Sequence, residues 1–579
     1  MKKWSLLFPL GAGLLALLLS ASFIQKAVDP SHGLSSYDLD TFARLPVQAD
    51  GRVKPMDSVA RNSLRLIHGK TSLELPKDFS HEGNQTPEHK EGNQLTEMRA
   101  ITWLLQLQML PEVADHYPVF RIDHDQILGM FGWQRKDQKY FSYQSLKPHM
   151  EEILERQQSI AEKERSEQNV FEQQLLKLGN AILRYRALGH YALPAFIPPG
   201  SQDTDQQDWH SLMELLEAEG QEVFNNRPAA LYYRGMIQAY HQNKPEAFNK
   251  TVAALKSNLD TRNDTQKVDF EVLFNRLHPF LQSEMLYVLA FVFSILSWLF
   301  LPVPLRNAAL ALLTIGLLWH TFGLGTRMYL QGRPPVTNLY SSAVFVGWAA
   351  VILGLILEKV HRNSIGNAVA AICGFTTLLI APALSSSPDT LEMMQAVLDS
   401  NFWLATHVVV ISLGYSAMFL AGFLAILYLI RGLFTRSLDR ETARSLNRMV
   451  YAIICFAMLF SFVGTMLGGI WADQSWGRFW GWDPKENGAL LIVLWCAIAL
   501  HAGVGGFIKE RGLMALAVGG NIITSWSWFG TNMLGVGLHS YGFADKQFVG
   551  LAAFILLQLV CIGLFCLPKT YWRSGKIIK

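Results

Sequence analysis

Four tryptophans and one phenylalanine crowd into twelve residues of this chain, and acidic residues follow them directly. They are Trp471, Trp476, Phe479, Trp480 and Trp482, followed by Asp483 and Glu486. Tryptophans at a membrane surface usually form a belt that is spread over many helix ends. Because these indoles share one loop, with Gly477 and Gly481 between them, we interpret the loop as a platform for a large planar apolar ligand.

Two histidines flank this loop in the expected topology. His407 opens an apolar run at its outer end, and His539 follows a later run on the same side. A lone histidine at the end of a span is more often structural, but two at one depth beside an aromatic platform favour metal ligation. An iron porphyrin needs an apolar slab for its faces and axial imidazoles for its iron. The residues therefore indicate an iron tetrapyrrole held by His407 and His539 against the indoles.

A third histidine is placed deep in the apolar half. His501 lies about fourteen residues into its run, roughly 20 Å below the outer surface at 1.5 Å per residue. An ionisable residue at that depth is a functional candidate by default, so we expect a ligand for a second, transmembrane haem. The alternative is a hydrogen bond to a neighbouring helix. His320 does not match His501 well in depth, and His361, in a basic loop, is expected to have no special role.

Composition narrows the function class. The 579 residues are 50% hydrophobic and only 17% charged, with a net charge of +3, whereas soluble proteins carry about 25% charged residues. This argues against an ordinary cytosolic enzyme and against a nucleic-acid-binding protein. No CxxC or CxxCH motif is present, which excludes a dithiol oxidoreductase, a cysteine-type zinc site and a covalently attached c-type haem. The five cysteines are Cys373, Cys455, Cys496, Cys561 and Cys566.

Ten apolar runs are long enough to cross a membrane as helices. They are 4–23, 285–303, 307–325, 340–357, 365–384, 403–430, 449–470, 487–508, 511–530 and 548–567. With the N-terminus inside, the inner loops of the second half hold 14 Lys and Arg residues and the outer loops hold 5. The positive-inside rule therefore puts the tryptophan loop outside. The first run is favoured as a retained anchor, with a cleaved signal peptide as the alternative.

The expected fold is all-α: a polytopic membrane bundle of about ten helices with a large exported, mainly helical soluble domain. The domains are the anchor 1–23, the exported domain 24–283, and a polytopic domain 284–579 that contains the tryptophan-rich loop 471–486.

Within the exported domain, Ser80–Gln94 has almost no apolar residues and is expected to form a flexible loop. Met150–Arg186 has apolar residues at helical spacing. Pro228–Leu259 is expected to form two helices joined at Gln242–Pro245. This is favoured as a plain helical hairpin, although a helix–turn–helix repeat of about 34 residues has the same form.

The stretch WGRFWGWDPKE (Trp476–Glu486) resembles the tryptophan-rich signature of the haem-handling family of cytochrome c maturation. Its extension ENGALLIVLWCAIALH and the stretches His320–Arg327 and Gly332–Tyr340 resemble the CcsA type of system II more than the CcmC or CcmF types. The resemblance covers about 310–567. The segment LPVQADGRVKPMDSVAR (Leu45–Arg61) resembles, less specifically, the exported region of fused CcsBA proteins.

The resemblance implies a holocytochrome-c synthase in the bacterial cytoplasmic membrane, which exports haem b and attaches it to CxxCH motifs of apocytochrome c. It makes His407 and His539 the axial ligands of the external haem and His501 a ligand of the transmembrane haem. It assigns haem contact to the tryptophan loop, with Trp476, Trp480, Trp482 and Asp483 catalytic and Trp471 and Glu486 also binding. Lys485, Arg478 and Arg327 are plausible partners of the haem propionates by charge and side. The implied partners are haem, apocytochrome c, a thiol-reducing system and membrane lipid.

One departure from the family pattern concerns the second transmembrane ligand, which relatives take from an early span. The single early span here, 4–23, has no histidine. A separate CcsB- or ResB-like partner is therefore favoured as the source, with His320 or an incomplete inner site as alternatives. Two other functions stay open: a haem chaperone that hands haem to a separate ligase, and a transporter of another hydrophobic substrate. The exported domain is expected to act as a lid or as a receptor for the apocytochrome.

Overall fold

The computed structural model forms two compact units. Met1–Gln25 with Leu277–Lys579 is called the membrane unit, and Lys26–Arg276 is called the exported unit after the orientation predicted from the sequence. The structure describes residues 2–28, 36–76, 95–134, 139–163, 167–199, 208–260, 265–385, 387–394, 396–534 and 545–574. The predicted domain boundaries at 23/24 and 283/284 stay a prediction. The predicted flexible loop Ser80–Gln94 falls outside the described residues.

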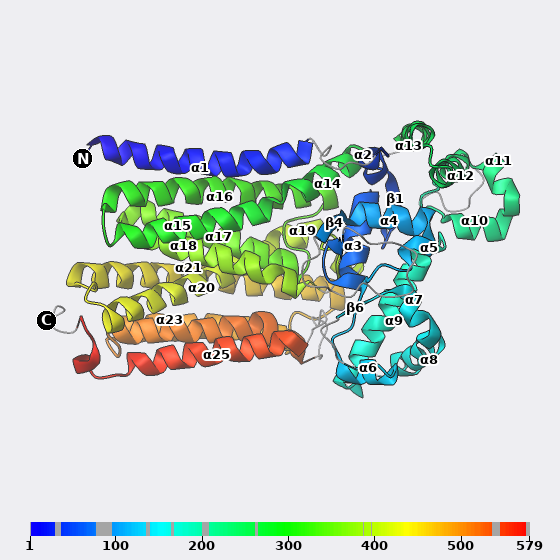
Figure 1. Cartoon of the computed structure of the whole chain (residues 1–579). Helices are drawn as coiled ribbons and strands as arrows, with labels where there is room; N and C mark the ends of the chain where they lie inside the picture. The colour runs from blue at the N-terminus through cyan, green and yellow to red at the C-terminus, as the bar shows by residue number, and fades with distance from the viewer. Residues whose placement is uncertain are drawn as a thin grey trace. The chain divides into compact units, whose positions relative to one another are not determined.

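The membrane unit consists of long apolar helices that pack side by side (Figure 1). Its helices are α1 (Lys2–Val28), α15 (Pro279–Ser297), α16 (Pro302–Gln331), α17 (Leu339–His361), α18 (Ile365–Ile380), α19 (Asn401–Trp403), α20 (Val409–Leu429), α21 (Arg440–Trp476), α22 (Pro484–Val504), α23 (Glu510–Ser525), α24 (Thr531–Met533) and α25 (Asp545–Phe565). In the described part of the chain, nine helices are long and apolar enough to cross a membrane. The all-α, multi-pass prediction is therefore confirmed.

The tenth predicted span, 511–530, forms α23 and the π-helical turn η8 (Trp526–Gly530). It is less apolar than the other spans because it carries polar side chains into the protein interior: Asn521, Thr524 and Ser527 are all buried. Its neighbours are α20, α22 and α25. The polar residues that lower the hydropathy of this helix therefore pack against the rest of the bundle.

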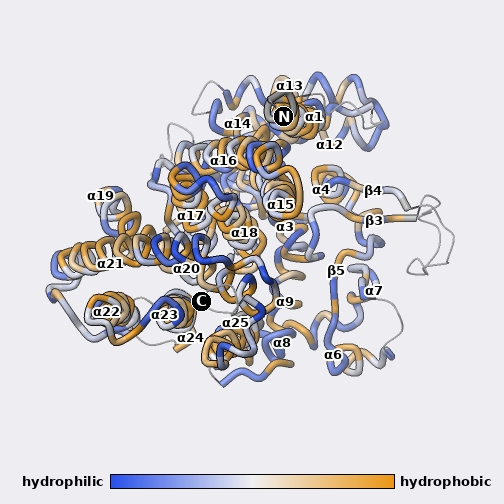
Figure 2. Tube along the Cα trace, turned by 90° about the vertical axis from the view of Figure 1, so that its left-hand side faces the viewer, coloured by the Kyte–Doolittle hydropathy of each residue, from blue (hydrophilic) through white to orange (hydrophobic). Residues whose placement is uncertain are grey.

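The two ends of the membrane unit differ in charge. Successive antiparallel helices bring the α17–α18, α20–α21 and α22–α23 connections to one end, which also holds the start of α16 and the residues after α25 (Figure 1). We call this the basic end, because its connections carry the Lys and Arg residues counted above. In Figure 2, hydrophilic residues gather at the near ends of α20 and α23. The opposite end carries the tryptophan loop, and we call it the tryptophan end.

The exported unit is mainly helical, with three two-stranded antiparallel sheets among its described residues. Its strands are β1 (Pro46–Ala49), β2 (Arg52–Pro55), β3 (Ser72–Pro76), β4 (Leu95–Arg99), β5 (Phe120–Arg121) and β6 (Tyr140–Phe141). Its helices are α2 (Leu39–Ala43), α3 (Met56–His68), α4 (Ala100–Met109), α5 (Pro111–Ala114), α6 (Asp125–Met130), α7 (Tyr143–Leu146), α8 (Met150–Ala161), α9 (Val170–Gly189), α10 (Leu212–Glu219), α11 (Val223–Asn226), α12 (Pro228–His241), α13 (Pro245–Asp260) and α14 (Thr265–Leu277). The helical hairpin predicted over Pro228–Leu259 is present as α12 and α13.

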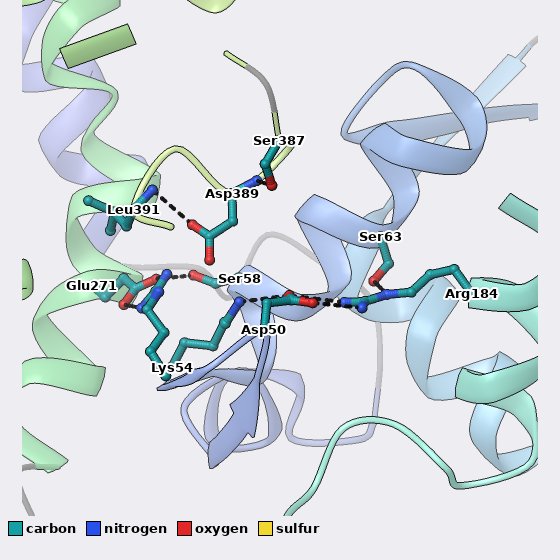
Figure 3. A network of polar contacts seen from close by, with 10 residues as sticks. Asp50, Lys54, Ser58, Ser63, Arg184, Glu271, Ser387, Asp389 and Leu391 are labelled. Atoms are coloured by element: carbon teal, nitrogen blue, oxygen red, sulfur yellow. Dashed lines mark hydrogen bonds and ion pairs between the residues drawn. The ribbon is translucent and has the colours of Figure 1, made fainter. Parts of the chain in front are cut away.

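A charged network fixes the segment Leu45–Arg61 within the exported unit (Figure 3). Glu271 on α14 accepts hydrogen bonds from Arg52 at 2.7 and 2.9 Å and from the Ser58 hydroxyl at 2.5 Å. Asp50 lies between the fully buried Lys54 and Arg184, at 2.9 Å from each. Burial alone raises the pKa of Asp50, but the two cations outweigh it and hold that pKa below its ordinary value.

Replacing Glu271 by Gln should destabilise this network. The variant removes the buried Glu271 carboxylate that accepts from Arg52 and Ser58, and losing hydrogen bonds to a charged group costs about 1.5–3 kcal/mol. We expect faster amide hydrogen exchange in β2 and α14 of the full-length protein. Glu217→Gln, on an exposed position of α10, is the matched control and should exchange like the parent. Unchanged exchange in Glu271→Gln would show that the network does not stabilise the segment.

Candidate functional site

A cavity of about 520 Å³ opens at the tryptophan end of the membrane unit. Its lining residues fall within six separate stretches of the chain: 336–346, 384, 392–398, 404–415, 465–489 and 528. One group of lining residues comes from the tryptophan loop and the helices beside it: His407, Ile411, Tyr415, Gly468, Trp471, Trp476, Trp480, Lys485, Glu486 and Trp528. A second group, which we call the opposite wall, consists of Val336, Thr337, Asn338, Leu339, Glu392, Met393, Met394 and Leu398. Its volume lies within the range of small-molecule and cofactor pockets, about 300–1,000 Å³.

His407 reaches this cavity from a π-helical turn, η6 (Leu404–Val408), that precedes α20. Its Nδ1 lies 2.8 Å from the backbone carbonyl oxygen of Gly464. Because a carbonyl oxygen only accepts, Nδ1 must carry the proton and donate it, and Nε2 then bears the ring's lone pair. This is the arrangement in which histidines ligate metals, since the second ring nitrogen is held by a backbone acceptor.

Glycine makes this placement possible. A Cβ atom at Gly468 would lie 2.6 Å from Cε1 of the His407 ring, so no other residue fits here without displacing the imidazole. At the next position, Gly469, a Cβ would lie 2.6 Å from the Phe479 ring. The last turns of α21 therefore present bare backbone on which the imidazole and one aromatic ring of the loop rest.

Three of the four tryptophans predicted for the loop line the cavity, namely Trp471, Trp476 and Trp480. Trp471 and Trp476 belong to the last turns of α21, so the loop begins at Gly477 and not at 471 as predicted. Trp471 contacts the His407 ring edge to face at 5.8 Å, and it stacks on Trp403 at 6.3 Å between ring centroids. Trp482 is different: its side chain is 69% exposed, and it meets Trp480 edge to face at 6.0 Å. Three of the four indoles thus share one cavity and Trp482 does not line it, and their action as a platform for a ligand stays a prediction.

The acidic residues after the indoles shape the loop. Asp483 is the N-cap of α22, and Glu486 completes a capping box with it. The Glu486 carboxylate accepts hydrogen bonds from the backbone N–H of Gly481 at 2.8 Å and of Asp483 at 3.1 Å. Arg478 lies 3.5 Å from the same carboxylate. These contacts fix the turn that carries Trp480 and Trp482. They also pair Arg478 with Glu486, and Arg478 does not line the cavity.

Lys485 lines the cavity and forms hydrogen bonds to another π-helical turn, η8. Its ammonium donates to the carbonyl oxygens of Ser527 at 3.1 Å and Trp528 at 2.7 Å. The Tyr415 hydroxyl is 2.7 Å from the Ser527 hydroxyl and also faces the cavity. The side-chain nitrogen of Lys485 is therefore held at the cavity wall by these two carbonyl oxygens.

The opposite wall was not anticipated as part of the site. Asn338 caps α17 and donates to Glu392 at 3.2 Å and to the Thr390 carbonyl at 3.2 Å. Asp389 shapes the turn around Thr390, because its carboxylate accepts a hydrogen bond from the Leu391 N–H at 3.0 Å (Figure 3). Although Gly332–Tyr340 supports the family resemblance, no residue type in 392–398 signals ligand binding.

Two arginines brace this wall. Arg327, expected near propionates, is instead buried and donates to the Thr390 hydroxyl and carbonyl at 2.8 and 2.6 Å. It does not line the cavity. Arg333 forms an ion pair with Asp399, with Nε 2.7 Å from Oδ1. This hydrogen bond lowers the pKa of Asp399.

The other predicted histidines lie elsewhere. His501 is exposed on α22, and its Nδ1 donates to the Ala497 carbonyl one turn earlier at 2.8 Å. His320 is fully buried and bonds through both ring nitrogens, to the Tyr287 hydroxyl and the Val344 carbonyl, each at 3.0 Å. Both ring nitrogens of His320 are therefore engaged within the protein, as is typical of a structural histidine. His539 lies outside the described residues, so its distance from His407 stays a prediction.

Comparisons with known proteins cover this site. Residues 336–539 match the family described as Cytochrome C assembly protein. Cytochrome c biogenesis protein CcsA of Synechococcus sp. is 31% identical over 252 residues, 38% of this chain and 82% of that protein. The CcsA protein of Guillardia theta is 32% identical over 250 residues, 39% of this chain and 82% of that protein.

Protein NrfI of Wolinella succinogenes is 25% identical over 566 residues, which is 93% of this chain but 58% of NrfI. The similarity to NrfI therefore includes the exported unit, although this chain spans less than two thirds of NrfI. The cavity from Val336 to Trp528 lies wholly within the matched residues 336–539. This chain belongs to the CcsA-type cytochrome c assembly family, and it is a multi-pass membrane protein with a role in cytochrome c biogenesis.

Proposed function

We propose that this protein exports haem across the bacterial cytoplasmic membrane and attaches it covalently to CxxCH motifs of apocytochrome c on the outer side. One observation carries the proposal: an imidazole with its lone pair on Nε2 shares a cavity of about 520 Å³ with three indoles of the tryptophan loop. An iron porphyrin needs an axial nitrogen ligand and an apolar surface for its ring. The described residues of the cavity supply one ligand and that surface.

In this proposal, His407 and His539 ligate the iron from two separate segments. Trp471, Trp476 and Trp480 contact the porphyrin, and Lys485 meets a propionate. Trp482, which is exposed, is placed to meet the incoming apocytochrome. Asp483 and Glu486 act by holding the loop, through the capping box described above. The exported unit is proposed to receive the apocytochrome, and its helical hairpin α12–α13 suits protein contact.

The attachment step is an addition. Each CxxCH thiol adds across one vinyl double bond of haem: a sulfur–carbon bond forms, and the thiol hydrogen ends on the other vinyl carbon. The atoms and electrons balance without an oxidant, but both thiols must be reduced beforehand, hence the expected thiol-reducing system. The histidine of the motif then replaces one protein ligand and releases the product. Most of the rate gain comes from holding vinyl groups and thiols at reacting distance.

Export requires a haem position within the membrane, for which His501 is proposed as one ligand. Its exposure on α22 and the structural role of His320 support a ligand from a CcsB- or ResB-like partner. The rival function, a haem chaperone without synthase activity, uses the same cavity and differs only in the covalent step. A transporter of another apolar substrate would have no use for the tautomer that Gly464 imposes on His407.

The contact of Gly468 with His407 gives a test of haem ligation. In Gly468→Ala the new methyl group displaces the imidazole, and we expect the affinity for haem to fall by about 10-fold, as for other disturbed outer-shell contacts. The absorption spectrum of the purified protein titrated with haem measures this. Gly563→Ala on α25, where a Cβ meets no atom within 4 Å, is the control and should bind like the parent. His407→Gly should lose the bis-histidine spectrum and regain it with added imidazole. A full spectrum in His407→Gly without imidazole contradicts the assignment.

The covalent step is tested by co-expression. The protein is produced with an apocytochrome c in a host that lacks its own maturation system, with and without a CcsB-like protein. We expect covalently haem-stained cytochrome when the partner is present, and strongly reduced staining when the protein carries His407→Gly. A protein that binds haem but gives no staining even with the partner would favour the chaperone.

A further inference from the structure

A second cavity lies at the basic end of the membrane unit, the end opposite the tryptophan loop. It is wide, about 2,460 Å³, and the ends of α20, α21, α22, α23 and α25 surround it. The residues that line it and matter here are Arg436, Asn447, Val504, Lys509, Glu510, Arg511, Lys569, Trp572 and Arg573. We call it the basic groove.

The charges of the basic groove are unbalanced. Five of its lining residues are cationic, and Glu510 is its one acidic lining residue within the described chain. Within that same part of the chain, Arg436, Lys509, Lys569 and Arg573 form no ion pair with a carboxylate, and their side chains are exposed. Like charges held together in this way repel one another, so an anionic ligand would stabilise the arrangement.

Arg511 and Trp572 contribute further hydrogen-bond donors to the basic groove. Arg511 is held by the carbonyl oxygens of Phe565 and Leu567, and its guanidinium lies 4.4 Å from the ring centre of Trp572. Trp572 is only 5% exposed, yet its Nε1–H has no hydrogen-bond partner among the described residues, and neither has Nε of Arg511. A buried N–H without an acceptor is costly. These two donors therefore point to an acceptor from outside the chain, such as a phosphate oxygen.

Apolar surface adjoins the charged residues. Val504, at the end of α22, lines the groove and is 77% exposed, and Leu513, Phe565 and Leu567 line it as well. The exposed apolar faces of α22 and α25 lead from the groove into the membrane-spanning part of the unit. A ligand that fits must therefore carry an anionic head and an apolar body.

We propose that the basic groove binds the headgroup of an anionic phospholipid from the inner leaflet. Its phosphate takes the place beside Arg511 and Trp572, the surrounding Lys and Arg residues neutralise it, and the acyl chains lie along α22 and α25. Basic pockets between transmembrane helices on the cytoplasmic side recognise such headgroups. This goes beyond the proposed function and shares with it only the assigned orientation in the membrane.

Native mass spectrometry of the full-length, haem-free protein tests this inference after exchange into vesicles of phosphatidylglycerol and phosphatidylcholine. We expect retention of phosphatidylglycerol over phosphatidylcholine by the parent protein, and about 10- to 100-fold weaker retention in the variant Lys509→Gln/Lys569→Gln/Arg573→Gln. Arg440→Gln/Arg444→Gln removes charge at the same end from residues that do not line the groove. That control should retain lipid like the parent. Trp572→Phe, which keeps the ring and removes the N–H donor, should weaken retention several-fold.

Three results would overturn the proposal. Equal retention of the two lipids would show that charge does not select the ligand. Equal losses in the triple variant and in the control would show a diffuse effect of charge. A triple variant that keeps phosphatidylglycerol but binds added haem more weakly would assign the groove to the haem carboxylates instead. Because the lipid measurement contains no haem, its failure leaves the proposed synthase function untouched.

Discussion

The hydrogen bond between Nδ1 of His407 and the Gly464 carbonyl is the interaction on which the candidate site depends. It fixes both the direction of the ring and the nitrogen that carries the proton. The π-helical turn η6 widens the helix at the point where the His407 ring reaches α21. Gly468 has no side chain that would block the ring. π-helical turns are frequent at functional sites, and η8 brings Trp528 to the same cavity.

The tryptophan loop is organised around this imidazole by ordinary helix-capping forces. A large cluster of indoles would collapse onto itself in water, and the capping box of α22 prevents this by fixing the backbone from Gly481 to Glu486. Trp471 comes instead from the last turns of α21, where its stacking on Trp403 connects it to the turn that carries His407. The loop, η6 and the two helices thus form one arrangement, in which a change at one contact moves the others.

The sequence predicted the parts of the site whose residue types are chemically unusual. A segment so dense in tryptophan and glycine is rare, and so is a histidine at the end of an apolar span such as His407. The structure brings Trp471, Trp476, Trp480 and His407 to one cavity. The opposite wall escaped prediction because Asn338, Met393 and Leu398 are unremarkable residues far away in the sequence. Their position depends on how the segment that contains Thr390 and Glu392 packs against the start of α17, which hydropathy does not encode. The short strands β1 to β6 were missed for a similar reason, since strands of two to five residues show little alternation of polar and apolar residues.

His320 and His501 show where depth along a helix is informative and where it is not. Both lie inside apolar helices, yet His320 has two internal hydrogen-bond partners and His501 has a single partner on its own helix. The difference is the helix face: His320 faces the closely packed α15 and α17, whereas His501 lies on an exposed face of α22. An imidazole turned out of the bundle gains its second interaction from outside it. This orientation favours a site completed by another membrane protein over one that this chain completes through His320.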